Sequence, residues 1–231
     1  MPFAAEYGEK EYWEQRYAKE DANHLFDWYM PYECFSSTLR TYLKKKATRV
    51  LYLGCGLSEV PEKLHGDGFT NVTAVDFVPR IVAQMAQRNR EREGLAFQLA
   101  DISDTHTTLP EADVIVDKGM LDSVICVKHS AEHTKQAREN IYAALAPGGV
   151  YLCVSHSGPD ARLHALKDPA CPWDVTVTTI KAVALAEYLR GGRLDRIDSP
   201  YNPNLVGVGS FQEDCYYLYH CRKPLEPAAP G

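Results

Sequence analysis

The chain has 231 residues, of which 45% are apolar and 24% charged, a balance typical of one large folded domain and unlike that of a globally disordered chain. Its formal net charge of -6 disfavours a broad electrostatic surface for nucleic acid. No apolar run approaches the roughly 20 residues needed to span a membrane, so we expect no membrane partner.

The first part of the chain is rich in aromatic residues on segments with helical character. We therefore expect residues 1–45 to form an N-terminal helical and aromatic cover that packs on the main domain. From residue 49 onward, short apolar or β-branched runs alternate with helical patterns. The predicted strands are 49–53, 71–75, 95–100, 112–117 and 149–155. The clearest helical patterns span 79–93 and 132–149. Such alternation predicts parallel pairing through right-handed crossovers, and so an open, doubly wound sheet.

The last third of the chain is richer in strand-forming residues. Residues 173–180 and 214–223 are predicted strands, with a helical pattern at 181–191 between them, and an antiparallel pair at the sheet edge fits this order. Residues 46–223 therefore form one predicted α/β domain, in which we assign no role to residues 159–212. The proline-rich residues 224–231 predict a disordered tail.

The stretch RVLYLGCGLSEV, residues 49–60, ends an apolar strand at two glycines. Ligands of open parallel sheets bind at the carboxyl ends of strands, where Gly54 permits a tight turn and Gly56 leaves room for a ligand against the backbone. A dinucleotide site usually has a third glycine where this chain has Glu59, and a carboxylate is poorly suited to a phosphate. The pattern favours an adenosine without phosphates and disfavours a nicotinamide-dependent oxidoreductase.

Two carboxylates at the ends of the next predicted strands support this interpretation. Asp76 can accept hydrogen bonds from both ribose hydroxyls, and Asp101 can reach the exocyclic amine of an adenine. Each signal alone is compatible with a simple turn or a helix cap. Three such signals at successive strand ends point to an S-adenosylmethionine site.

The segments EYWEQRY, FDWY, VLYLGCG, NVTAVDF, ADI and VDKGMLDSV occur in the order and at the spacing of a known family. Over about residues 6–158 the chain resembles class I, seven-β-strand S-adenosylmethionine-dependent methyltransferases. Among these it is most similar to the methyltransferase-like proteins that methylate lysines of translation elongation factor 1-alpha. The resemblance implies a Rossmann-like seven-stranded sheet, mostly parallel with an antiparallel edge strand. It implies S-adenosyl-L-methionine as cofactor, S-adenosyl-L-homocysteine as product and a protein with an exposed lysine as acceptor.

The resemblance also implies a cofactor site at the matching positions. Aromatic residues of the cover would fold over the methionine end, since ring faces suit the positive sulfonium. The glycine turn would meet that end through its backbone, carboxylates and apolar neighbours would hold ribose and adenine, and a lysine would line the cleft near the sulfur. These residues are Trp13, Tyr17, Trp28, Gly54, Gly56, Asp76, Phe77, Asp101, Ile102 and Lys118. Without the resemblance, plain core packing is the alternative for the two tryptophans.

The chain departs from the family pattern at two positions. Leu57 stands where the family usually has asparagine, and Met120 where it usually has threonine. The two changes leave the cofactor prediction intact but weaken the transfer of a particular substrate. Asp117 and Asp122 are candidates to orient a lysine amine, with helix capping or turn chemistry as the alternative role. No catalytic proton acceptor is assigned.

Other sites and functions receive less support. His129 and His133 lack a third ligand at a recognisable spacing, so no metal site is predicted. The sequence after the fourth predicted strand, DKGM, lacks the proline-rich motif of base-methylating enzymes, which argues against nucleic acid. The seven cysteines contain no C-x-x-C pair and predict a reduced, cytoplasmic protein. A small-molecule methyltransferase and a non-catalytic cofactor-binding module remain alternatives, and no oligomeric state is predicted.

Overall fold

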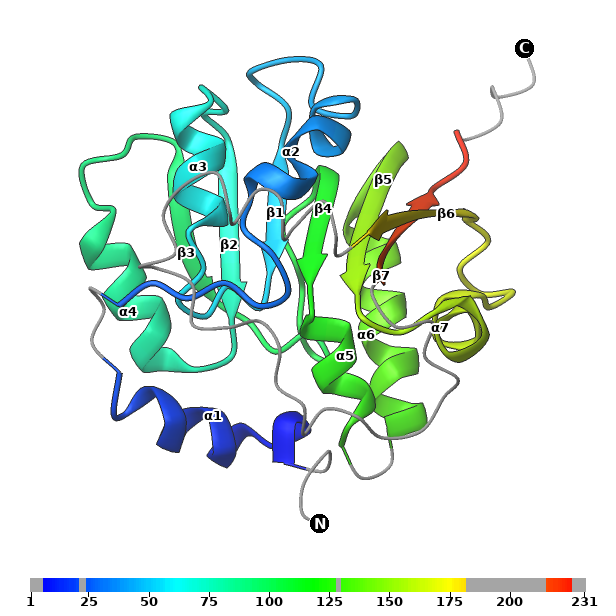
Figure 1. Cartoon of the computed structure of the whole chain (residues 1–231), viewed down its shortest axis with the longest axis horizontal. Coiled ribbons are helices and arrows are strands. Elements are labelled where there is room, and N and C mark those ends of the chain that lie inside the picture. The colour runs from blue at the N-terminus through cyan, green and yellow to red at the C-terminus, as the bar shows by residue number, and fades with distance from the viewer. Residues whose placement is uncertain (1–5, 21–23, 128–129, 182–214, 226–231) are drawn as a thin grey trace.

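The computed structural model describes residues 6–20, 24–127, 130–181 and 215–225, and its centre is a seven-stranded sheet (Figure 1). The strand order is β3-β2-β1-β4-β5-β7-β6. The strands are β1 (Val50–Leu53), β2 (Val72–Asp76), β3 (Leu95–Leu99), β4 (Ala112–Lys118), β5 (Leu145–Ser155), β6 (Asp174–Lys181) and β7 (Cys215–Arg222). The first five pair in parallel, whereas β7 runs antiparallel to both β5 and β6. The predicted fold class is confirmed, with the antiparallel strand lying one place in from the edge.

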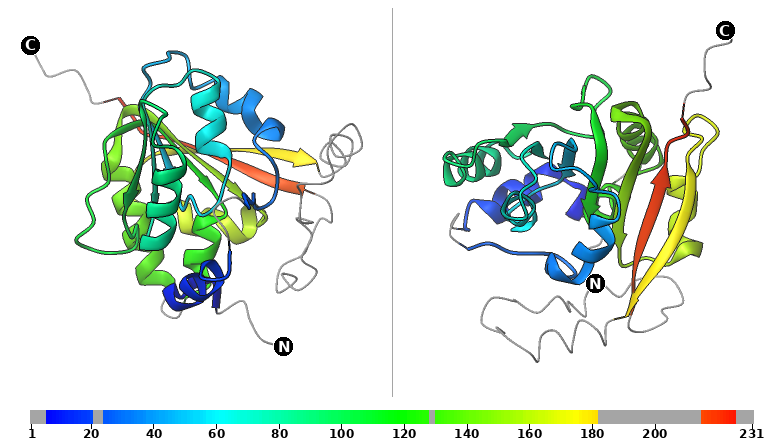
Figure 2. Two further views of the ribbon diagram at one scale, coloured as in Figure 1. Left: turned by 90° about the vertical axis from the view of Figure 1, so that its left-hand side faces the viewer. Right: turned by 90° about the horizontal axis from the view of Figure 1, so that it is seen from above.

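The helices cover both faces of this sheet (Figure 2). They are η1 (Glu6–Gly8), α1 (Lys10–Tyr17), α2 (Glu33–Arg40), α3 (Val60–Gly66), α4 (Pro79–Arg88), α5 (Met120–Ile125), α6 (Ser130–Ala144) and α7 (Pro159–Leu166). Side chains of α2, α3 and α4 pack on one face, and those of α5, α6 and α7 on the other. Successive residues of a strand point to opposite faces, so Tyr52 joins the first layer while Leu51 and Leu53 join the second.

One strand boundary differs from its prediction. β5 begins at Leu145, directly after α6, although the proline and glycines that follow predicted a start at 149. Leu145 pairs with Ala112, and a register shift separates that pair from the regular pairing of Val114 with Val150. The irregular ladder accommodates the turn residues inside the strand. Lys181, the first residue of the predicted helix at 181–191, ends β6 instead. The rest of that predicted helix and most of the predicted tail lie outside the described residues.

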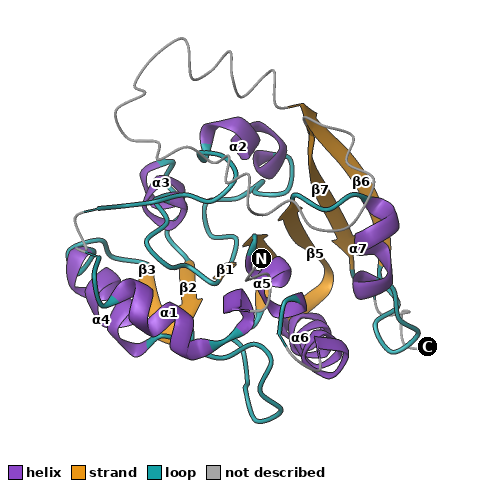
Figure 3. Ribbon diagram, turned by 60° about the horizontal axis from the view of Figure 1, so that its bottom comes forward, coloured by secondary structure: helices purple, strands orange, loops and turns teal. Residues whose placement is uncertain are grey.

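α1 lies at the carboxyl edge of the sheet, below the strand ends in Figure 1 and in front of them in Figure 3, whereas α2 packs on one face of the sheet. There α1 spans the edge, and residues 24–32, here called the strap, run back across the glycine turn. The Phe26 amide donates to the Leu57 carbonyl at 2.9 Å. The boundary at residue 45 between cover and domain stays a prediction. Within the described part of the chain, no helix is long and apolar enough to cross a membrane.

Candidate functional site

A cavity of about 300 Å³ opens at the carboxyl ends of the central strands, beneath α1 and the strap. This volume lies within the range of small-molecule and cofactor sites. All ten residues predicted to hold the cofactor line it: Trp13, Tyr17, Trp28, Gly54, Gly56, Asp76, Phe77, Asp101, Ile102 and Lys118. Of the two candidate orienting residues, Asp122 also lines the cavity, whereas Asp117 is not among its lining residues. The binding role of each residue stays a prediction.

The two glycines are required by close contacts within the chain. Both have positive φ angles, 60° at Gly54 and 45° at Gly56. A Cβ atom on Gly54 would lie 2.6 Å from the Met120 Cγ, and one on Gly56 would lie 2.6 Å from the Tyr17 hydroxyl. The close approach that the sequence assigned to a ligand is therefore made in this structure by Tyr17 of the cover.

Asp76 lies at the base of the cavity and is only 5% exposed. Its two carboxylate oxygens accept from the Gly56 amide at 2.8 Å and the Val78 amide at 3.0 Å. Burial raises the pKa of Asp76, while these backbone hydrogen bonds act to lower it. A carboxylate offers about four acceptor positions, so Asp76 keeps capacity for two ligand hydroxyls. Asp101 accepts from the Ser103 amide and hydroxyl through Oδ1 alone.

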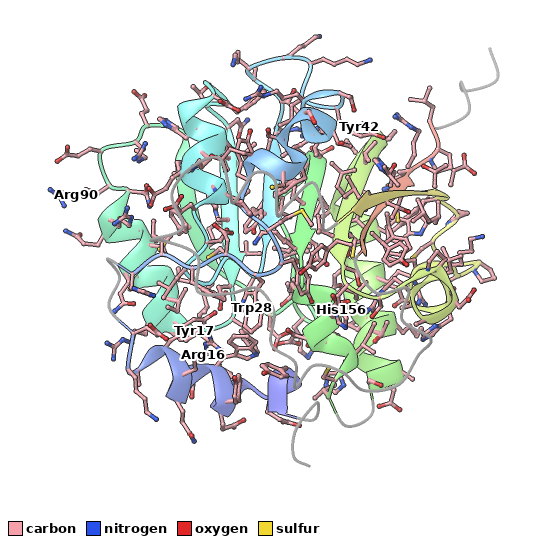
Figure 4. The ribbon with its side chains drawn as sticks, viewed as in Figure 1. Arg16, Tyr17, Trp28, Tyr42, Arg90 and His156 are labelled. Carbon is pink, nitrogen blue, oxygen red and sulfur yellow. The ribbon has the colours of Figure 1, made fainter. Side chains whose placement is uncertain are left out.

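Aromatic rings of the cover surround a cation that the sequence analysis did not single out. The Arg16 guanidinium lies 5.1 Å from the Trp28 ring centroid, 5.6 Å from that of Phe26 and 5.8 Å from that of Trp13. Trp13 also stacks on Tyr17 at 5.6 Å. These residues both pack together and line the cavity, so the core-packing and ligand-contact interpretations of the tryptophans are compatible. Figure 4 labels Arg16, Tyr17 and Trp28 at this edge.

Lys118 fastens the strap to the sheet. Its side chain is 1% exposed, and its ammonium donates to the Asp27 carboxylate at 2.8 Å and the Trp28 carbonyl at 2.7 Å. Asp27 also accepts from the Ser58 hydroxyl at 2.6 Å and the Glu59 amide at 3.1 Å. One carboxylate thus joins the strap, the end of β4 and the turn before α3. Asp27 belongs to the FDWY segment, and no role was predicted for it from the sequence.

Asp117 has the geometry of a helix cap. Its buried carboxylate accepts from the Met120 amide at 2.8 Å, the Leu121 amide at 3.1 Å and the Tyr151 hydroxyl at 2.8 Å. Burial raises the pKa of Asp117 to about 6, although these hydrogen bonds oppose the shift. The observed contacts match the capping alternative stated for this residue.

Asp122 is the centre of a polar cluster that faces the cavity. It accepts from the Tyr29 hydroxyl at 2.6 Å and the Ser155 hydroxyl at 2.7 Å, pairs with Arg162, and lies 3.0 Å from the His156 Nδ1. Burial disfavours the charged carboxylate, but Arg162 and His156 outweigh it and hold the pKa of Asp122 well below its usual range. His156 was not predicted. It directly follows β5, so the strand-end argument used for Asp76 would have found it.

No cluster of three or more His, Cys, Asp or Glu side chains suited to a metal ion occurs among the described residues. His133 lines the cavity. His129 lies outside the described ranges, so the predicted absence of a metal site remains a prediction for that pair.

Residues 44–187 match a family described as a methyltransferase domain. The eEF1A lysine and N-terminal methyltransferase of Danio rerio is 33% identical over 153 residues, which cover 66% of this chain but only 22% of that protein. The EEF1A lysine methyltransferase 4 of Mus musculus is 29% identical over 182 residues, which cover 75% of this chain and 71% of that protein. The methyltransferase srdJ of Neurospora crassa is 29% identical over 192 residues, 76% of each chain.

The fold is also that of solved structures with distant sequences. The N-methyltransferase NodS from Bradyrhizobium japonicum, in complex with S-adenosyl-L-homocysteine, superposes with a TM-score of 0.56 at 18% identity over 95% of each chain. This likeness establishes the architecture and no more.

Proposed function

This chain belongs to the methyltransferase domain family and uses S-adenosyl-L-methionine as its methyl donor, and from that premise we propose that it methylates a lysine on another protein. One observation carries the proposal: the similarity to a relative named for lysine methylation of elongation factor 1-alpha extends over 71% of that relative. Elongation factor 1-alpha is the acceptor to test first. A translation factor as acceptor also implies a cytoplasmic location.

The cavity residues suit an S-adenosylmethionine molecule. Asp76 would bind the ribose and Asp101 the adenine, since both have acceptor capacity at the strand ends. The Trp13 and Trp28 rings would face the sulfonium, and Arg16 among them would pair with the carboxylate of the methionine end. The support is the arrangement of complementary charges along one cavity of suitable size.

Bound S-adenosylmethionine supplies a methyl group activated by a positively charged sulfur. The protein's part is to align the acceptor nitrogen with the methyl carbon, because the transfer is an in-line displacement. The lysine must also be neutral. Deprotonating an ordinary lysine at pH 7 costs about 4–5 kcal/mol, from a pKa of roughly 10.4. Aromatic walls that exclude water from the amine lower this cost. Because only the neutral amine reacts, the transfer rate should rise with pH.

The test is transfer of labelled methyl groups to recombinant elongation factor 1-alpha and, in parallel, to a whole-cell extract. We expect one or very few labelled proteins, with the modified lysine located by mass spectrometry. Label found only in small molecules would support the small-molecule alternative, and label in RNA would contradict the interpretation of the DKGM segment. The remaining alternative is a non-catalytic cofactor-binding module. Such a module would bind S-adenosylhomocysteine in calorimetry but transfer no labelled methyl group to any acceptor.

A further inference from the structure

His156 joins the cavity to the Asp122 cluster. It follows β5 at the carboxyl edge of the sheet and lines the cavity together with Trp28. Figure 4 labels both residues. Its imidazole is 31% exposed, so the ring has both a buried side and a side open to the cavity. On the buried side, Nδ1 lies 3.0 Å from the Asp122 Oδ2 and 3.0 Å from the Tyr29 hydroxyl.

The surroundings of Nδ1 fix where the proton of a neutral imidazole resides. Asp122 is held ionised by its buried pairing with Arg162, and an ionised carboxylate can only accept hydrogen bonds. Tyr29 donates its hydroxyl proton to the same carboxylate at 2.6 Å. Nδ1 must therefore carry the ring proton and donate it. The lone pair is then on Nε2, whose described neighbour is the Ser157 hydroxyl at 3.4 Å, a long contact.

We propose that Nε2 of His156 accepts the proton that the acceptor amine loses before methyl transfer, with Asp122 as the positioning residue. The proposal rests on the amine acceptor of the proposed function. The ammonium N–H bond breaks and its proton binds Nε2, which leaves the nitrogen lone pair free. That lone pair forms the N–C bond as the C–S bond breaks, and the electron pair of the broken bond stays on sulfur. The imidazolium then returns its proton to solvent through its exposed side.

The charges around the ring favour this role. Asp122 on α5 stabilises an imidazolium, as carboxylates do in histidine-based catalytic sites. The Arg162 cation of α7 opposes this effect but is paired with the same carboxylate. Among the described residues, two further titratable groups lie close by: the Tyr29 hydroxyl of the strap, 3.0 Å from Nδ1, and the Cys126 thiol, which directly follows α5 and lines the same cavity. Burial raises the pKa of both, so both stay neutral at neutral pH and add no charge beside the Asp122–Arg162 pair.

Nitrogen NMR of the imidazole tests the proposal without any protein acceptor. We expect His156 to be the Nδ1–H tautomer at neutral pH, with an unprotonated Nε2. Adding n-butylamine, an analogue of the lysine side chain, to the complex with S-adenosylhomocysteine should shift the Nε2 resonance. The signal is assigned by its loss in His156→Asn. An Nε2–H tautomer, or an Nε2 resonance that n-butylamine leaves unchanged, would overturn the proposal.

Kinetics with elongation factor 1-alpha give the second test. His156→Asn keeps an N–H donor for Asp122 but removes Nε2, so kcat should fall about 10²–10⁴-fold while the Kd of S-adenosylhomocysteine changes less than about twofold. The matched control His164→Asn, at an exposed position of α7, should retain wild-type kcat. The pH profile of kcat/KM should differ between the two proteins, and that of the variant should keep rising toward the amine pKa near roughly 10. Identical pH profiles would contradict the proposal.

The two tests separate the two proposals. If the wild type transfers nothing to elongation factor 1-alpha, the acceptor named in the proposed function is wrong, and the NMR experiment still decides the role of His156. If transfer occurs but His156→Asn retains full kcat, the acceptor is right and the proton acceptor is wrong.

Discussion

Two aspartates five positions apart show how strongly single residues depend on partners that are distant in sequence. Asp117 and Asp122 are both buried, and they were equivalent candidates for orienting an amine. Burial, with a smaller contribution from the nearby Asp122 charge, raises the pKa of Asp117 to about 6, whereas the pairing with Arg162 keeps Asp122 ionised. Only Asp122 faces the cavity. The difference originates on α7, which the local sequence around the two aspartates does not contain.

The raised pKa of Asp117 predicts a pH effect on stability. The unfolded chain releases this proton near its ordinary pKa, whereas the folded chain retains it up to about pH 6. The wild type therefore loses stability as pH rises from about 4 to 6, by on the order of 3 kcal/mol. Asp117→Asn has no carboxyl group to titrate and so lacks this loss. The free energy of unfolding of the variant minus that of the wild type, measured by urea unfolding, should therefore increase as the pH rises from 4 to 7.

Asp113 provides the control for that measurement. Hydrogen bonds from Arg49 lower the pKa of Asp113, so its contribution to stability is present above its ordinary pKa and is lost as pH falls. Asp113→Asn should therefore show little change relative to wild type between about pH 5 and 7, and below about pH 4 its free energy of unfolding relative to wild type should increase as the pH falls. A pH-independent difference between Asp117→Asn and wild type would contradict the assignment of the raised pKa.

Asp76 is the residue whose cofactor role is simplest to measure. Asp76→Asn keeps the size of the side chain but removes the charge that the proposed contact with the ribose hydroxyls depends on. The affinity for S-adenosylhomocysteine should fall by about 1.5–3 kcal/mol, the scale of charge-assisted hydrogen bonds, as measured by calorimetry. Asp101→Asn should cost less, because adenine keeps its apolar contacts. Unchanged affinity in a folded Asp76→Asn protein would exclude the ribose role.

At the scale of elements, the sheet could be predicted and the attachment of the cover could not. The seven strands have short apolar runs that mark them locally, and the parallel pairing of the first five follows from their alternation with helices. The strap has no such periodicity. Its position depends on Asp27 and Lys118, which are distant in sequence and meet only in the folded chain. The start of β5 differed because residue pairing with Ala112 outweighed the local turn signal.

The Asp27–Lys118 pair should make a large contribution to holding the strap. Asp27→Ala leaves a buried ammonium without its counter-charge and should destabilise the fold by about 3–5 kcal/mol in urea unfolding. In the double variant with Lys118→Met, an apolar chain of similar volume replaces the ammonium, and part of that loss should be recovered. If the two single effects simply add, the pair does not act as a unit.

At the scale of the whole molecule, the position of the cavity could be predicted from the sequence, whereas the polar cluster around Asp122 could not. A parallel sheet brings all its strand ends to one edge, so residues picked at strand ends line one cavity. The polar cluster around Asp122 draws instead on the strap, α5, the end of β5 and α7. No spacing in the sequence encodes that meeting of four segments.

The charge of the whole chain predicts how it meets an acceptor. The net charge is -6, and Glu9, Glu11 and Glu20 line the cavity beneath the cover. Negative charge there should attract a lysine-bearing surface and chiefly raise the rate of encounter. Raising the salt concentration from 50 to 300 mM should therefore lower kcat/KM for elongation factor 1-alpha several-fold and leave kcat nearly unchanged. If kcat falls in parallel with kcat/KM, the salt effect does not arise from the rate of encounter.

The contact between Tyr17 and Gly56 has a consequence for turnover. The strap is fastened by buried polar groups, whereas α1 covers the cavity with stacked rings and places a hydroxyl against the glycine turn. We therefore expect cofactor exchange to require α1 to lift while the strap stays in place. Rings that shield the reaction should also lengthen the residence time of the spent product, so its departure should set the upper limit of turnover. We expect product inhibition, and hence an enzyme that responds to the cellular ratio of S-adenosylmethionine to S-adenosylhomocysteine.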